Sequence, residues 1–105
     1  MNVNFYLKSI EEKEKFFLED YLKEKIKRLE KLCAGRAIDQ FKLDVKAEQF
    51  AKKSAYQVEF IFTLAGKSFT ASEDDHTIRE ALDMAFDKLI KQVRIYIGKE
   101  KDQKK

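Results

Sequence analysis

The chain has 105 residues, of which 44% are hydrophobic and 39% are charged. This length suits one domain with a real core and is too short for two independent domains, and nine Phe and four Tyr exclude a disordered chain. The net charge of +3 permits a nucleic-acid partner without requiring one. Whether the chain has a nucleic-acid-binding surface must therefore be judged from where the charges lie.

Cysteine usage and the lack of long apolar segments indicate the compartment. Cys33 is the only cysteine, so no internal disulfide can form, and its apolar neighbours Leu29 and Leu32 predict that the thiol is buried. The first residues lack a basic leader followed by an apolar run, and no stretch approaches the roughly eighteen apolar residues that span a bilayer. We therefore expect a soluble, cytoplasmic protein.

The chain begins with a short strand and a long helix. Residues 2–7 alternate apolar and polar side chains, which predicts a strand. Between about residues 12 and 33 apolar residues recur every three or four positions, which predicts an amphipathic helix. Gly35 is placed to end that helix in a left-handed conformation. The buried stripe of the helix comprises Leu18, Leu22, Ile26, Leu29 and Cys33.

Three further strands are predicted next. Residues 41–48 and 55–64 alternate apolar and polar side chains with a period of two, which is typical of antiparallel strands with one buried face. A polar hairpin connection joins these two segments. A tighter turn at residues 65–67 leads into a brief strand at residues 68–72.

The last predicted element is a second helix. Ser72, Asp74 or Asp75 is expected to cap it, because Ser72 and Asp75 have the spacing of a capping box. Residues 99–105 are expected to form a basic, flexible tail. The buried stripe of the helix comprises Ile78, Ala81, Leu82, Ala85, Leu89, Val93 and Tyr96.

The element order β-α-β-β-β-α predicts an α+β fold, a two-layer sandwich in a single domain over residues 1–98. A helical connection between parallel strands is almost always right-handed, and the two hairpins then set the directions of the later strands. The first, second and fourth strands therefore run the same way, and each helix runs back against one of them. We expect a four-stranded sheet with two parallel helices on one face.

Charge changes sign along both predicted helices. In the first helix, residues 11–20 carry a net charge of −3 and residues 21–31 a net charge of +3. In the region of the second helix, residues 73–87 carry a net charge of −5 and residues 88–105 a net charge of +5. Helix dipoles favour this polarity and explain part of it. Because the helices are expected to be parallel, their basic C-terminal halves should lie together at one edge.

The two basic halves supply a predicted phosphate-binding site. Two cations are three positions apart on the first helix, and residues 88, 91 and 94 repeat that spacing on the second, so each set projects to one side. A cluster of about five cations is the footprint expected for nucleic-acid phosphates. The predicted site comprises Lys25, Arg28, Lys88, Lys91 and Arg94.

Two segments of the chain carry a resemblance to a known family. Residues 66–93, GKSFTASEDDHTIREALDMAFDKLIKQV, contain a Gly turn, a strand ending in Ala-Ser, an acidic segment and a helix with Ala-Leu-Asp, Asp-Lys-Leu and Lys-Gln. The first helix contains Lys-x-x-Arg-Leu-Glu at residues 25–30. In this combination the chain resembles the short-form ribosome hibernation-promoting factors, a family of ribosome-associated inhibitors also called sigma-54 modulation proteins.

The resemblance implies a function at the ribosome. It implies that the domain lies in the small-subunit channel that mRNA and the anticodon ends of tRNA would otherwise occupy, and that this occupancy inhibits translation. It also implies that four of the predicted cations meet small-subunit rRNA phosphates. These are Lys25, Arg28, Lys88 and Lys91.

The chain departs from the family pattern in several places. Residues 77–79 replace the usual Asp-Met-Tyr, and the loop after the first strand lacks the usual Gly. Ile95 and Ile97 stand where the family has basic residues, whereas Arg94 adds a cation nearby. These departures bear on how far an rRNA contact extends along the last helix.

Other functions have less support from the sequence. His76 is the only histidine, so neither a typical zinc site nor a Cys-His nucleophile can be assembled, and we expect no enzyme, no metal and no cofactor. Tyr56, Phe60 and Phe62 could form a base-stacking platform, but their alternation favours the core beneath the helices. The second hypothesis is a protein-interaction or homodimerisation module of the same fold, because an open strand edge can pair with a second copy.

Overall fold

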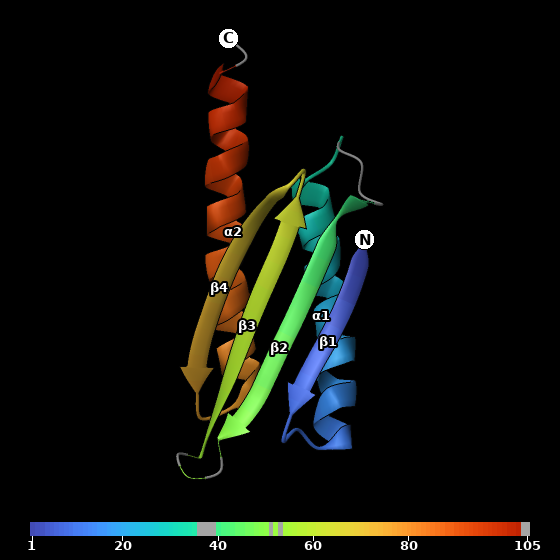
Figure 1. Cartoon of the computed structure of the whole chain (residues 1–105), viewed down its shortest axis with the longest axis vertical. Coiled ribbons are helices and arrows are strands. Elements are labelled where there is room, and N and C mark those ends of the chain that lie inside the picture. Colours follow the sequence, from blue (N-terminus) through green and yellow to red (C-terminus); the bar gives the residue numbers. More distant parts are fainter. Residues whose placement is uncertain (36–39, 51, 53, 104–105) are drawn as a thin grey trace.

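The computed structural model describes residues 1–35, 40–50, 52 and 54–103. Two helices and four strands form a sheet layer and a helix layer (Figure 1), which confirms the predicted α+β fold class and element order. The elements are β1 (Asn2–Lys8), α1 (Glu12–Leu32), β2 (Lys42–Phe50), β3 (Ala55–Leu64), β4 (Lys67–Asp75) and α2 (Ile78–Gln103).

The sheet has the strand order β1-β2-β3-β4, so β1 and β4 are its edges. β1 pairs with β2 in parallel, and the other two pairs are antiparallel. β1 and β4 therefore point the same way, and each is followed by a helix that runs back against it. Both helices cover the same face of the sheet and run in the same direction (Figure 1), as predicted.

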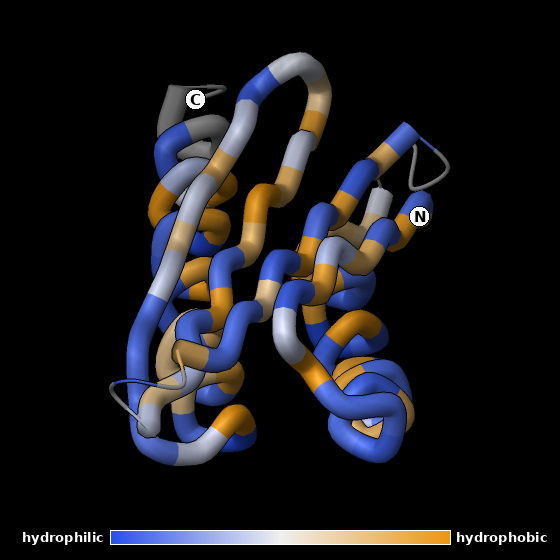
Figure 2. Tube along the Cα trace, turned by 60° about the horizontal axis from the view of Figure 1, so that its bottom comes forward, coloured by the Kyte–Doolittle hydropathy of each residue, from blue (hydrophilic) through white to orange (hydrophobic). Residues whose placement is uncertain are grey.

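Alternating side chains bury one face of the strands. Along β2 and β3, buried residues such as Val45, Phe60 and Phe62 alternate with more exposed ones, and Figure 2 shows this alternation of hydropathy along the strands. The ring of Phe60 packs edge-on against Phe86 of α2, with the ring centroids 5.4 Å apart. Phe60 and Phe62 are therefore core residues, as predicted, and Tyr56 is partly buried.

Both helices bury the stripes that their periodicity predicts. Leu18, Leu22, Leu29 and Cys33 are buried in α1 and at its C-cap, whereas Ile26 is only partly buried. In α2, Phe86, Ile90 and Ile97 are buried in addition to the predicted stripe, of which Tyr96 is only partly buried. Because α2 also packs beside α1, its apolar surface is wider than a sheet alone would require.

Left-handed backbone occurs at two predicted turns. Gly35 has a φ of 92° just after α1, as expected for a helix stop. The hairpin between β3 and β4 is made by Ala65 and Gly66, with φ angles of 51° and 80°. Positive φ at both central residues is the geometry of a two-residue type I′ turn, which suits the twist of the strands.

The start of α2 differs from the prediction. β4 continues to pair with β3 as far as Asp75, so the expected caps Ser72, Asp74 and Asp75 are strand residues. The hydroxyl of Thr77 instead accepts a hydrogen bond from the backbone N–H of Glu80 at 3.2 Å, at the residue before α2 begins. The predicted caps were wrong because pairing with β3 overrides the local preference of Ser and Asp for helix starts.

The end of α2 also differs from the prediction. The helix continues past Gly98 to Gln103, so the tail expected from residue 99 onward is helical as far as residue 103. As a result α2 projects beyond the end of the sheet (Figure 1).

Candidate nucleic-acid interface

The basic halves of the two helices lie toward the same end of the molecule. α1 and α2 run in parallel (Figure 1), so residues 21–31 and the part of α2 after residue 87 both lie toward the helix C-termini. The acidic N-terminal halves lie toward the opposite end. This is the arrangement that the predicted phosphate-binding edge requires.

Contacts on α2 define two flanks of that helix. Asp83 faces α1, because its carboxylate contacts Lys25. Gln92 faces the edge strand β4, because its side-chain amide donates a hydrogen bond to the carbonyl oxygen of Thr70 at 2.9 Å. Lys88, which pairs with Glu73 of β4, lies on the flank toward β4.

Lys25 is held between the helices. Its Nζ lies 2.9 Å from Oδ1 of Asp83, and only 17% of its side chain is exposed. The same ammonium group lies 5.2 Å from the ring centroid of Tyr21 and 5.5 Å from that of Phe86. Lys25 was predicted as a phosphate ligand, but in this structure its charge is offset by Asp83 and its ammonium group joins α1 to α2.

The carboxylate of Asp83 is the centre of this contact. The hydroxyl of Tyr21 donates to both of its oxygens, at 2.8 and 3.0 Å. Partial burial alone would raise the pKa of Asp83, but hydrogen bonds from Lys25 and Tyr21, with the charges of Lys25 and Arg79, lower that pKa below its usual value. Asp83 therefore remains ionised at neutral pH and holds both partners.

The other four predicted cations are exposed. Arg28, Lys91 and Arg94 make no ion pair with any residue of the described part of the chain. Lys88 pairs with Glu73 of β4, while 56% of its side chain remains accessible. These four side chains are therefore accessible to solvent and to a polyanion.

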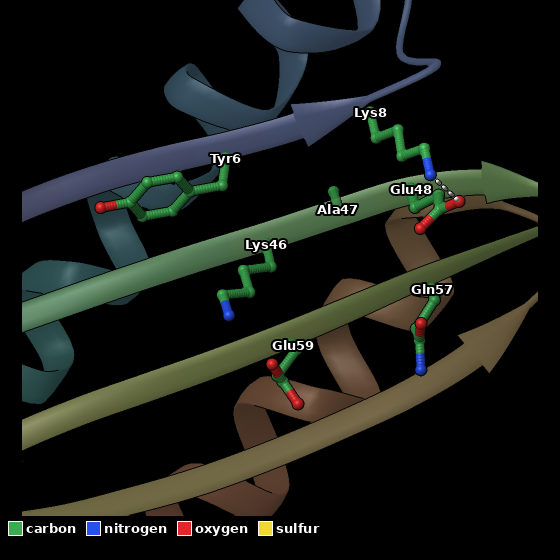
Figure 3. Close-up of a pocket in the computed structure, with 7 residues that line it drawn as sticks. All are labelled: Tyr6, Lys8, Lys46, Ala47, Glu48, Gln57 and Glu59. Carbon is green, nitrogen blue, oxygen red and sulfur yellow. Dashed lines mark ion pairs between the residues drawn. The ribbon is translucent and has the colours of Figure 1, made fainter.

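A shallow pocket on the opposite face of the sheet was not predicted. It has a volume of about 220 Å³ and is lined by side chains of β1, β2 and β3, among them Tyr6, Lys46 and Glu59 (Figure 3). At its border Lys8 pairs with Glu48 at 3.7 Å. The alternation of side chains along the strands predicts that these residues lie on the outer face of the sheet, but it does not predict a pocket there. Because both signs of charge are present, the pocket has no clear preference for an anion or a cation.

His76 lies in the connection between β4 and α2. Its backbone N–H donates to Oδ1 of Asp75 at 2.7 Å, and its ring Nδ1 lies 3.5 Å from the carbonyl oxygen of Ser54. Within the described ranges, His, Cys, Asp and Glu side chains form no group that could hold a metal ion. A membrane-crossing helix, long and apolar enough, is likewise not found among those residues.

Comparisons with known proteins identify related folds. The sequence model of the family described as sigma 54 modulation protein / S30EA ribosomal protein matches residues 5–101. The crystal structure of the Thermus thermophilus Protein Y N-terminal domain superposes with a TM-score of 0.73 at 23% identity, covering 91% of this chain and 99% of that chain. For a ribosomal subunit interface protein from Coxiella burnetii, the TM-score is 0.61 at 15% identity, with 93% and 99% covered. Both likenesses concern the fold, and a comparison with curated protein sequences finds no match.

Proposed function

Because the chain belongs to the sigma-54 modulation protein / S30EA ribosomal protein family, as its resemblance predicted, we propose that it binds the small ribosomal subunit and inhibits translation there. This family comprises ribosome-associated modulation factors and not enzymes. By occupying the channel of mRNA and tRNA anticodon ends, the bound domain keeps a cytoplasmic ribosome idle.

One observation supports this proposal above the others. The parallel helices bring two basic halves to one end, where Arg28, Lys91 and Arg94 are exposed and lack an ion pair within the described part of the chain. Unpaired cations at one end attract rRNA phosphates, and the acidic halves at the other end repel them. The charge distribution therefore favours one orientation of the domain on the RNA.

The predicted cations take two roles in this proposal. Arg28, Lys88, Lys91 and Arg94 contact rRNA phosphates, and Lys88 exchanges its partner Glu73 for a phosphate on binding. Lys25 acts indirectly, because its contact with Asp83 fixes the spacing of the two helices. Phosphate contacts of this kind fix the register of a protein on RNA without selecting a sequence.

Charge reversal at the basic end tests the proposal. The double variant Lys91→Glu with Arg94→Glu should no longer sediment with small ribosomal subunits at low salt, because two attractive contacts become repulsive. The matched control, Lys13→Glu with Lys15→Glu, changes the net charge equally at exposed positions in the acidic half of α1 and should sediment like the wild type. Circular dichroism is used to check that both variants are folded.

Retained sedimentation of the folded Lys91→Glu, Arg94→Glu variant would contradict the proposed site. It would point to another surface of the protein as the subunit-binding site. Failure of the wild-type protein to sediment with subunits would instead favour the second hypothesis, a protein-interaction or homodimerisation module, for which the edge strands β1 and β4 offer a surface. Sedimentation equilibrium of the protein alone separates these cases, because a homodimer changes its mass without any ribosome present.

A further inference from the structure

A groove lies between the edge strand β4 and the flank of α2 that faces it. Its volume is about 330 Å³. The rings of Phe69 and Tyr96 line it and meet edge-on, with centroids 5.4 Å apart and an interplanar angle of 63°. Ile95 also lines the groove, and 60% of this residue is exposed. Phe69 itself is buried and Tyr96 is partly buried, so the apolar surface open to solvent on the basic half of α2 consists of Ile95 and the exposed part of the Tyr96 ring.

Positive and hydrogen-bonding groups border this surface. The Nζ atom of Lys67 lies 4.8 Å from the ring centroid of Tyr96, and Lys99 lines the groove from the next turn of α2. Ser68 contributes a hydroxyl and Gln92 an amide. No acidic side chain is among the described residues that line the groove. The site therefore suits a ligand that combines a flat apolar body, polar edges and negative charge.

The cations continue along α2 beyond the groove. Lys88, Lys91, Ile95 and Lys99 follow one another at intervals of three or four residues, which places them on one stripe. At a rise of 1.5 Å per residue, this stripe extends over about 16 Å. The contact of Lys88 with Glu73 fixes this side of the helix toward β4.

We propose that this flank of α2 binds an unpaired, single-stranded segment of RNA, with one base in the groove and its phosphates on Lys88, Lys91 and Lys99. The inference rests on the proposed function and specifies which form of RNA is recognised. Proteins that bind single strands combine a positive track with exposed ring surfaces on which bases stack. A duplex keeps its bases paired and cannot fill the groove. An acidic peptide would fit the lysines of the groove, but its acidic side chains offer no flat apolar group to lie against Ile95 and Tyr96.

A short, fluorescently labelled oligouridylate provides the direct test, because it needs no ribosomal subunit. Ile95→Ala removes one apolar contact surface and should weaken binding of this probe roughly fivefold, as expected for loss of a partly buried aliphatic contact. Phe16→Ala is the matched control, since Phe16 is also 60% exposed and lies in the other helix. It should bind the probe like the wild type. An abasic oligonucleotide of the same length should bind the wild type and Ile95→Ala equally.

Ultraviolet cross-linking locates the base on the protein. After irradiation of the oligouridylate complex, mass spectrometry should find the added nucleotide on the peptide that contains Tyr96. Equal affinity of wild type and Ile95→Ala for oligouridylate would overturn the inference, as would cross-links confined to Tyr6 on the outer face. The inference would also be overturned if an oligoglutamate peptide displaced the probe and Ile95→Ala weakened the binding of that peptide. That result would favour an acidic protein partner.

The outcomes for the inference and for the proposed function are separate. If Lys91→Glu with Arg94→Glu abolishes sedimentation with subunits while Ile95→Ala leaves oligouridylate binding unchanged, the proposed function stands and the base site is wrong. If oligouridylate binding depends on Ile95 but no variant or wild-type protein sediments with subunits, the base site stands and the ribosomal target is wrong.

Discussion

Lys25 and Lys91 lie in the basic halves of two parallel helices, yet their surroundings give them different chemistry. Asp83 offsets the charge of Lys25, and two aromatic rings cover its ammonium group. Lys91 is exposed and has no ion pair within the described residues. Sequence spacing identifies both as helix-surface cations. It cannot separate them, because the partner of Lys25 comes from an element that is distant in the chain.

The contact of Asp83 with Lys25 predicts a specific dependence of stability on pH. The folded state lowers the pKa of Asp83 from its reference value of 3.8, so the contact stabilises the fold above that pH and is lost as the pH falls further. Asp83→Asn should therefore lower the free energy of unfolding at pH 7, and the difference from wild type should be smaller at about pH 3, which is below the reference pKa. Urea unfolding at both pH values measures this.

The control for this prediction is Asp20→Asn. Asp20 pairs with Lys23 at 3.7 Å, but both side chains are largely exposed, and surface pairs contribute little to stability. This variant should unfold like the wild type at both pH values. A difference between Asp83→Asn and wild type that is the same at low and neutral pH would exclude the ion pair as its cause.

For helices and strands, periodicity predicts which elements form better than it predicts where they begin and end. The spacing of apolar residues correctly predicted two helices and four strands, because burying one face is a property of the whole segment. The boundary between β4 and α2 was wrong. Ser72 and the acidic residues after it are typical helix caps, but the same residues are also compatible with an exposed edge strand. Only the pairing with β3 decides between them, and that pairing is not local in sequence.

The revised boundary makes Thr77 the residue that caps α2. Thr77→Ala removes the hydroxyl that accepts the backbone N–H of Glu80, and it should lower the free energy of unfolding by about 1 kcal/mol. Ser72→Ala changes an exposed strand residue and should stay within about 0.5 kcal/mol of wild type. Urea titrations of both variants provide the comparison. The opposite ranking would restore Ser72 as the cap.

At the scale of the whole molecule, handedness allowed the sequence to predict the arrangement of the helices. A right-handed crossover and two hairpins leave α1 and α2 parallel, and this brings the basic halves to one end. The groove beside β4 could not be predicted in the same way. It depends on how closely α2 packs against the edge strand, on the contact between Gln92 and Thr70, and on the extension of α2 past Gly98.

In the proposed function, the exposed cations at this end bind small-subunit rRNA by contacting its phosphates. The most direct measurement is the affinity for isolated small ribosomal subunits as a function of salt concentration. For wild type, the logarithm of the association constant should fall linearly with the logarithm of salt, and Lys91→Ala and Arg94→Ala should each reduce the slope by about 0.7 to 0.9. Lys13→Ala, in the acidic half of α1, should leave the slope unchanged. Identical slopes for wild type and all three variants would contradict the proposed phosphate contacts.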